Sequence, residues 1–211
     1  MARYIDGSVV HYLEDAASGS PTPGGGSASA LAGAIGTAMA AMAANFTAGR
    51  KKFAQVEGVV RECLDALAAA RGRLLAAVDA DVEAYAGVGA AYGLPKGTDA
   101  EKSARRAAIA EALREAMGPP LATLRACADA LATTARLAPV ANPNLITDVG
   151  VAAHLVRAAL EGAALNVLIN VNALGGAEGA AATREEMASL LARGRADAAS
   201  AIEAVERALA G

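Results

Sequence analysis

Asp81 is the carboxylate in this sequence whose neighbours best suit it to proton transfer. In a helix it shares a face with the pairs Ala77–Val78 and Ala84–Tyr85, and that face is apolar apart from the tyrosine hydroxyl. Partial removal from water raises the pKa of a carboxylate towards the range useful for general acid–base catalysis. In the alternative interpretation, Asp81 only makes a polar contact with a neighbouring helix. Asp79 aligns with Glu83 and is expected on a solvated edge.

A second candidate is the proline- and glycine-rich stretch Pro21-Thr22-Pro23-Gly24-Gly25-Gly26-Ser27. Glycine tolerates positive φ and close backbone approach, and Ser27 is of a type that caps helices. The stretch predicts an irregular turn rich in N–H groups at the mouth of a helix, where an anion or a polar ring can bind. No Walker lysine follows the glycines. The alternative is a loop that only has to turn sharply.

Two further groups of side chains offer hydrogen bonds. The segment Asn142-Pro143-Asn144, with Thr147 and Asp148, gathers polar groups at a predicted helix N-terminus, although these are also ordinary turn and capping residues. Asn166 and Asn170 are four residues apart in an apolar run, so both amides face the same way. Buried amides must find partners, and these two either bind a ligand or cross-link helices.

The elements that must position these residues are helices throughout. Start and stop signals predict helices over 8–18, 27–48, 55–92, 98 to about 137, 147–174 and 183 to the C-terminus, with capping boxes at Thr98 and Thr183. Gly175-Gly176 is expected to close the fifth, and Gly118-Pro119-Pro120 to interrupt the fourth, because proline removes a donor. No segment alternates with period two. We therefore predict an all-α, single-domain bundle of about six or seven helices over residues 1–211.

Composition narrows the function classes. The net charge of −3 and the aromatic content of 3% argue against nucleic-acid binding. The two cysteines, Cys63 and Cys127, read as separate core thiols of a protein from a reducing compartment, and the start of the chain lacks a signal-peptide pattern. His and Cys spacings typical of a metal site are missing from the sequence, so we predict no metal.

Residues 28–46 carry no charge and nearly reach membrane-spanning length. Their large apolar members recur at spacings of three and four among Ala and Gly, as on one stripe of a helix. We interpret this segment as the central helix of a soluble bundle. A membrane span remains the alternative.

The ordered set of motifs resembles the cyclodeaminase/cyclohydrolase family, which includes the C-terminal domain of formiminotransferase-cyclodeaminase and stand-alone methenyltetrahydrofolate cyclohydrolases. The resemblance covers nearly the whole chain. It is carried by Pro-Thr-Pro-Gly-Gly-Gly-Ser at 21–27, Thr-Ala-Gly-Arg-Lys-Lys-Phe at 47–53, Val-Asp-Ala-Asp-Val-Glu-Ala-Tyr at 78–85, Leu-Pro-Lys at 94–96, Asn-Pro-Asn-Leu-Ile-Thr-Asp at 142–148 and Asn-Val-Leu-Ile-Asn at 166–170.

The resemblance implies an all-α homodimer that binds a tetrahydrofolate. Asp81 matches the aspartate associated with cyclodeaminase activity, and Lys51 and Lys52 look suited to the carboxylates of the glutamate tail. The other residues that it implies in substrate binding are Pro23, Gly24, Gly25, Gly26, Ser27, Lys96, Asn142, Asn144, Thr147, Asp148, Asn166 and Asn170.

The activity expected first is hydrolysis of 5,10-methenyltetrahydrofolate to 10-formyltetrahydrofolate by a cytoplasmic enzyme. It would need no cofactor beyond the tetrahydrofolate substrate, and no nucleic-acid or membrane partner. Two alternatives stay open: a formiminotetrahydrofolate cyclodeaminase that releases ammonia, and a helical dimer that binds folate without turnover.

Overall fold

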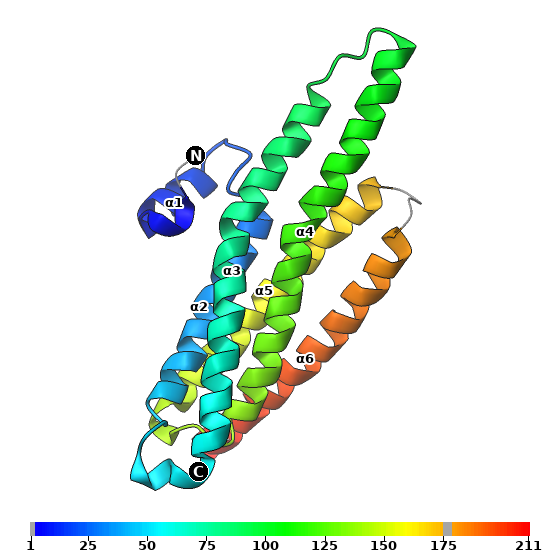
Figure 1. Cartoon of the computed structure of the whole chain (residues 1–211). Coiled ribbons are helices and arrows are strands. Elements are labelled where there is room, and N and C mark those ends of the chain that lie inside the picture. The colour runs from blue at the N-terminus through cyan, green and yellow to red at the C-terminus, as the bar shows by residue number, and fades with distance from the viewer. Residues whose placement is uncertain (1–2, 175–178) are drawn as a thin grey trace.

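The computed structural model describes residues 3–174 and 179–211, and Figure 1 shows a bundle of long helices. Within these residues there are six α-helices, three short 3-10 helices and no strand, which confirms the predicted all-α class. The α-helices are α1 (Val9–Ala16), α2 (Gly25–Asn45), α3 (Glu57–Tyr92), α4 (Asp99–Leu137), α5 (Ile146–Ala173) and α6 (Ala180–Ala210). The 3-10 helices are η1 (Tyr4–Asp6), η2 (Lys51–Val56) and η3 (Pro143–Leu145).

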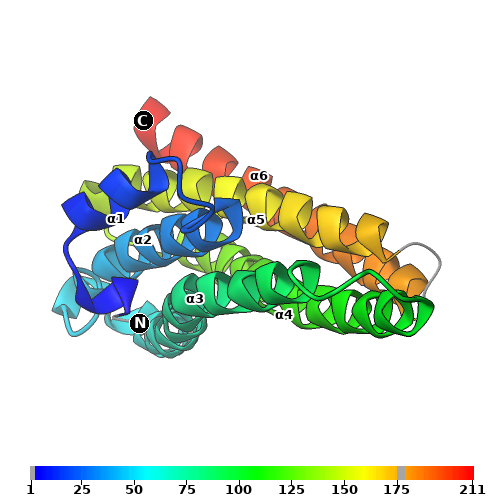
Figure 2. The same cartoon turned by 90° about the horizontal axis from the view of Figure 1, so that it is seen from above.

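The long helices run up and down the bundle in chain order. α2 packs against α3 and α5, and α4 packs against α3, α5 and α6 (Figures 1 and 2). The short N-terminal elements lie outside this bundle, where Tyr12 of α1 is buried against Ala30 of α2 and Ala77 of α3. Cys63 and Cys127 are free, buried thiols in the core.

α2 turns its small residues towards the core. A Cβ at Gly36 would lie 2.6 Å from Val156 Cγ2 of α5, so these two helices approach closely. Its large apolar side chains lie on the other side, where Ile35 is 48% exposed and the following Phe46 is 46% exposed. By length and composition α2 and the segment Pro143–Ala173 could each cross a membrane, but core helices of soluble proteins pass the same test.

α4 runs without interruption through Pro119 and Pro120, so the predicted break there is wrong. The N–H that Pro120 lacks would have bonded to the carbonyl of Ala116, four residues earlier. Instead Asn170 Nδ2 of α5 donates to that oxygen at 3.3 Å. Packing between α4 and α5 thus replaces the missing helical bond, and the helix continues.

Three predicted helix starts are shifted. α2 begins at Gly25 with Gly24 as its N-cap, so Ser27 lies inside the helix and does not cap it. Thr147 likewise lies inside α5, because η3 already turns the chain into the helix.

The last helix also begins early. It starts at Ala180 after Gly179, whose φ of 88° turns the chain, and Thr183 is already within it. The Ala run favours this longer helix. The capping box at Thr98 and Glu101 is confirmed, whereas the stop expected at Gly175-Gly176 lies outside the described residues.

Candidate functional site

A cavity of about 440 Å³ opens where the start of α2 meets α3, α4 and α5. Its size is that of a small-molecule site, and its lining combines apolar side chains with a few polar groups. The lining residues are Pro21, Thr22, Gly24, Gly25, Gly26, Asp81, Tyr85, Val88, Tyr92, Leu113, Ala116, Asn166, Ile169, Asn170 and Ala173. Six of the predicted site residues therefore come together here.

Asp81 supplies the carboxylate of this cavity. Its Oδ2 accepts a hydrogen bond from the backbone N–H of Ser27 at 2.9 Å. Burial raises the pKa of Asp81, and the hydrogen bond from Ser27 opposes this effect without cancelling it. The carboxylate is thus held in one orientation and shifted towards the pKa range of a general base or acid, as the apolar face around it predicts.

The glycines allow the start of α2 to approach the carboxylate. A Cβ at Gly26 would collide with Oδ1 of Asp81, and a Cβ at Gly25 would lie 3.3 Å from Nδ2 of Asn166. The two glycines are the first two residues of α2, not parts of an irregular loop. The need for glycine here is close approach to side chains of α3 and α5, since neither residue has positive φ.

Asn166 and Asn170 form the polar part of the α5 wall. Asn166 Nδ2 donates to the carbonyl of Gly162 at 2.9 Å, and Asn170 Nδ2 donates to the carbonyls of Ala116 and Asn166. Both amide nitrogens are therefore used by the backbone. Their Oδ1 atoms are the acceptors that these side chains offer to a ligand in the cavity.

The remaining walls are apolar and aromatic. Tyr85, Val88 and Tyr92 follow Asp81 along α3 at spacings of four, three and four, so they lie on one face of the helix. Tyr85 is 48% exposed and Tyr92 is 52% exposed. Sequence reasoning had named only Tyr85 here, although the spacing itself was a signal that could have found Val88 and Tyr92.

A hydroxyl from α1 bonds to the side chain of Ser27, the residue whose N–H holds the carboxylate. Tyr12 donates from its hydroxyl to Ser27 Oγ at 3.1 Å, and both side chains are buried. Pro23 is also buried, next to the cavity rather than in its lining. Ser27 and Pro23 thus belong to the structure that positions the site.

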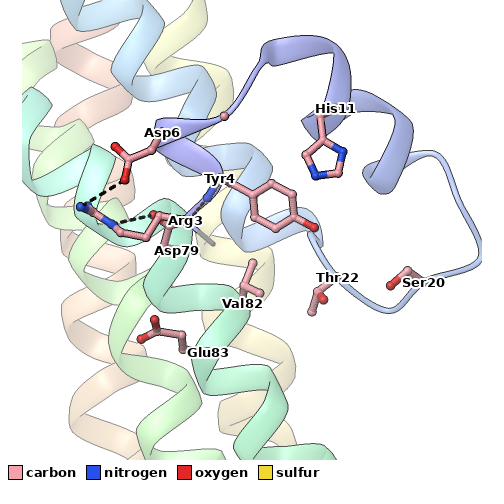
Figure 3. A pocket seen from close by; sticks show the side chains of 10 residues that line it. Arg3, Tyr4, Asp6, His11, Ser20, Thr22, Asp79, Val82 and Glu83 are labelled. Atoms are coloured by element: carbon pink, nitrogen blue, oxygen red, sulfur yellow. Dashed lines mark hydrogen bonds and ion pairs between the residues drawn. The ribbon is translucent and has the colours of Figure 1, made fainter. Parts of the chain in front are cut away.

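A neighbouring hollow of about 620 Å³ lies between the N-terminal segment and α3, and Figure 3 shows the Arg3 side chain and the backbone nitrogen of Tyr4 directed at Asp79 there. Asp79 Oδ1 accepts the N–H of Tyr4 at 2.7 Å, and Arg3 Nε lies 3.4 Å from Oδ2. Only 12% of the Asp79 side chain is exposed, so the expectation of a solvated edge is wrong. Periodicity along α3 cannot reveal a cover that comes from 75 residues away.

The other predicted site residues lie away from the cavity. Lys51 and Lys52 are exposed in η2, beyond the far end of α2, and a helix of 21 residues is about 30 Å long. The Asn142–Asp148 segment lies at that same far end, where the N–H of Asn142 donates to Thr47 Oγ1 and its Nδ2 to the carbonyl of Phe46. That segment supplies the predicted residues Asn142, Asn144, Thr147 and Asp148.

Lys96 is exposed in the connection between α3 and α4. Within one chain, then, the predicted residues form two groups at opposite ends of the bundle, with Lys96 near the cavity end. Among the described residues no group of three or more His, Cys, Asp or Glu side chains could hold a metal ion.

Comparison with known proteins places this geometry in context. A family model described as formiminotransferase-cyclodeaminase matches residues 8–189. A methenyltetrahydrofolate cyclohydrolase from Methylorubrum extorquens is 42% identical over 88% of this chain and 89% of its own length. The rat formimidoyltransferase-cyclodeaminase is 32% identical over 96% of this chain, which spans 37% of that protein. A crystal structure of formiminotetrahydrofolate cyclodeaminase from Thermotoga maritima superposes with a TM-score of 0.78 at 30% identity, covering 97% of this chain and 96% of that one.

Proposed function

This chain belongs to the formiminotransferase-cyclodeaminase family, and we propose that it hydrolyses 5,10-methenyltetrahydrofolate to 10-formyltetrahydrofolate. The observation that carries the proposal is Asp81, a partly buried carboxylate fixed by the N–H of Ser27 inside a cavity of ligand size. The Methylorubrum relative, which matches along most of its own length, bears the name of this activity.

Asp81 acts as the general base and then as the general acid. Ionised Asp81 takes a proton from water as the water oxygen bonds to the methenyl carbon between N5 and N10. Asp81 returns that proton to N5 as the bond between carbon and N5 breaks. The second proton of the water leaves as the formyl carbonyl forms on N10, so one proton is released for each turnover.

The cavity walls hold the rest of the substrate. The Oδ1 atoms of Asn166 and Asn170 accept hydrogen bonds from N–H groups of the pterin ring, and the apolar wall packs against its faces. Holding the methenyl carbon next to Asp81 in this way supplies the orientation on which the rate depends.

Purified protein mixed with 5,10-methenyltetrahydrofolate tests the proposal, because opening of the ring abolishes the absorbance of the methenyl bridge. We expect loss of that absorbance well above the rate in buffer, with 10-formyltetrahydrofolate as the product. A rate equal to that in buffer, from protein shown to be folded by circular dichroism, would contradict it.

Cyclodeaminase activity is the second candidate, favoured by the name and similarity of the Thermotoga structure. In that reaction N10 attacks the formimino carbon on N5, and ammonia leaves after a proton is transferred to it. The same carboxylate could supply that proton. Ammonia release from 5-formiminotetrahydrofolate, measured beside hydrolysis, decides which reaction is faster.

We also propose that the protein is a homodimer in the cytoplasm. Large apolar side chains are exposed on the adjacent helices α2 and α5, among them Ile35, Leu165 and Ile169. A second copy of the chain would remove this surface from water. Light scattering at micromolar concentration should give twice the mass of one chain.

The location in the cytoplasm is supported by the two cysteines. Cys63 and Cys127 are free, buried thiols, as expected for a protein from a reducing compartment.

A further inference from the structure

Tyr12 is the buried residue of the short helix α1, which lies against the outside of the bundle (Figure 1). It is 5% exposed, and it clusters with Ala30 of α2 and with Ala77 and Val78 of α3. Packing alone would need only a phenyl ring, and a buried hydroxyl costs free energy unless it finds a partner. The hydroxyl of Tyr12 bonds to Ser27 Oγ at 3.1 Å. It therefore links α1 to the first turn of α2.

Ser27 connects this bond to the carboxylate of the cavity. The first N–H groups of a helix have no carbonyl acceptor within it. In α2 the helical bonds begin with the N–H of Ala28, which donates to the carbonyl of Gly24 at 3.0 Å. The N–H of Ser27 comes one residue earlier, and Asp81 Oδ2 accepts it at 2.9 Å. The direction of this N–H therefore depends on how the first turn of α2 is held.

The side chain of Ser27 is held by a different helix. A serine within a helix can bond back to the carbonyl four residues earlier, as Ser29 does to Gly25 at 2.7 Å. By contrast, Ser27 Oγ accepts the hydroxyl of Tyr12 from α1, and both side chains are buried. One residue thus joins the phenol to the carboxylate, through its side chain on one side and its backbone on the other.

We propose that Tyr12 is a positioning residue for Asp81, because its hydroxyl holds Ser27 and Ser27 presents the N–H that orients the carboxylate. Tyr12 lies outside the lining of the cavity, so it acts only through Ser27. Burial raises the pKa of Tyr12, and the hydroxyl therefore keeps its proton where carboxylates titrate. The kinetic effect of Tyr12 rests on the proposed hydrolysis, whereas its effect on the Asp81 carboxylate does not.

Loss of the hydroxyl should change the pKa of Asp81 in one direction. The N–H of Ser27 stabilises the ionised carboxylate and lowers its pKa, against the larger effect of burial. A loosened N–H lowers it less, so the pKa of Asp81 should rise further in Tyr12→Phe. Among the described residues, the other titratable side chains that line the cavity are Tyr85 and Tyr92 of α3, and α2, α4 and α5 contribute none. Phenols titrate far above carboxylates.

Tyr12→Phe removes the hydroxyl and keeps the ring, and its first test is hydrolysis of 5,10-methenyltetrahydrofolate. We expect kcat to fall about two- to tenfold, as the loss of one hydrogen bond implies. KM should stay within about twofold, because the lining of the cavity is unchanged. The acid limb of the pH–rate profile should move to higher pH. A loss of stability without movement of this limb would show that Tyr12 only supports the fold, and would overturn the proposal.

Tyr4→Phe is the matched control, because it removes the same group from a neighbouring tyrosine. The Tyr4 hydroxyl bonds to Asp15 of α1 at 2.7 Å. The variant keeps the ring, which meets the Tyr12 ring edge-on at 5.4 Å between centroids. It should leave kcat and the acid limb as in the wild type. Equal effects of Tyr4→Phe and Tyr12→Phe would contradict a specific role for the Tyr12 hydroxyl.

Ser27→Ala removes the acceptor of the same bond and keeps the backbone N–H. By itself it should raise the pKa of Asp81, as Tyr12→Phe does. In the double variant the two shifts should not add, because both changes break one bond. Additive shifts would mean that Tyr12 and Ser27 act on Asp81 independently, which would overturn the proposal.

Nuclear magnetic resonance measures the link without a substrate and so separates it from the proposed function. The resonance of the Asp81 carboxyl carbon, identified by its loss in Asp81→Asn, gives the pKa of that group. Hydrogen exchange gives the protection of the Ser27 amide. In Tyr12→Phe the pKa should rise and the amide should exchange faster, whether or not the protein hydrolyses the substrate. An unchanged pKa with unchanged exchange would overturn the role of Tyr12 and leave the proposed function standing.

Discussion

Gly26 and Asp81 touch so closely that position 26 has no room for a side chain. A Cβ there would collide with Oδ1 of the carboxylate, while Oδ2 accepts the N–H of Ser27 at 2.9 Å. The first turn of α2 therefore fixes the position of a side chain from α3. The position of the Asp81 carboxylate therefore depends on the absence of a Cβ at Gly26, just as its raised pKa depends on burial.

Gly26→Ala should displace the carboxylate and lower kcat/KM about 100-fold, the cost typical of a misplacement of about 1 Å. The change is measured in the hydrolysis assay. Gly72→Ala is the matched control, because Gly72 is an exposed helical residue with nothing within 4 Å of an added Cβ. It should keep full activity and gain roughly 0.5–1 kcal/mol of stability. Full activity of Gly26→Ala would contradict the close contact.

Asp81→Asn should lower kcat by about 10²–10⁴-fold, because the amide cannot accept and return a proton. The protein should remain folded, since an amide oxygen can still accept the N–H of Ser27. Asp65→Asn changes an exposed residue of the same helix in the same way and should have no effect. If Asp81→Asn hydrolysed substrate as fast as the wild type, the acid–base role would be lost.

The pH dependence of the rate follows from the direction of the Asp81 pKa. The ionised form is the base, so kcat/KM should fall as pH falls through a pKa that burial raises above the ordinary aspartate value of 3.8. A pH–rate profile measures this limb. An acid limb at or below the ordinary value would be inconsistent with a desolvated base.

The same shift has a consequence for stability. Because the folded state holds the proton more tightly than the unfolded state, its stabilisation is complete below the ordinary pKa. It is lost as pH rises through the raised pKa of the folded protein. Asp81→Asn should lack this decline, which denaturant unfolding at a series of pH values would reveal as a flatter curve. Parallel curves for the two proteins would show that the Asp81 pKa is unshifted.

Asn170→Ala should destabilise the protein by about 1–3 kcal/mol, because it leaves the carbonyl of Ala116 without a donor. In a Pro120→Ala background the restored N–H at position 120 can bond to that carbonyl, and the same change should cost less. Denaturant unfolding of the four proteins of this cycle gives the coupling energy.

Asn166→Ala serves as the control for that cycle. Its amide nitrogen bonds to Gly162 within its own helix, so its effect should add to that of Pro120→Ala within about 0.5 kcal/mol. If the losses of unfolding free energy in Asn170→Ala and Pro120→Ala also added in the double variant, Pro120 and Asn170 would act independently, which would contradict the prediction.

Much of the fold follows from local signals. Helical period, the capping box at Thr98 and the Gly-Pro stop after Tyr92 are properties of neighbouring residues, so they can be read along the chain. The prediction of a break at Pro119-Pro120 was wrong because the interaction that keeps α4 continuous there is not local. The donor that replaces the missing N–H comes from Asn170, 50 residues further along, and no local pattern predicts it.

The site was predictable only in part. Asp81 could be found because the residues that desolvate it share its own helix face. Resemblance to a family supplied Lys51 and Asn142 as well, but a motif order carries no distances, and the structure places both at the far end of α2. Tyr92 was missed although it lies on the same face of α3 as Asp81 and Tyr85, and its contact with Arg105 comes from across the turn of a hairpin.

The amide of Asn170 both bonds to α4 and lines the cavity, so a change at this position affects the packing of the helices and the ligand site together. A substitution that altered Asn170 to suit a different ligand would also unsettle α4, unless Pro120 changed as well. Conversely, in a chain with another residue in place of Pro120, the Ala116 carbonyl would no longer need Asn170 Nδ2, which would keep its bond to the carbonyl of Asn166. Ligand preference and the continuity of α4 therefore depend on the same side chain. A redesign of this cavity that replaces Asn170 has to replace Pro120 first, although Pro120 does not line the cavity.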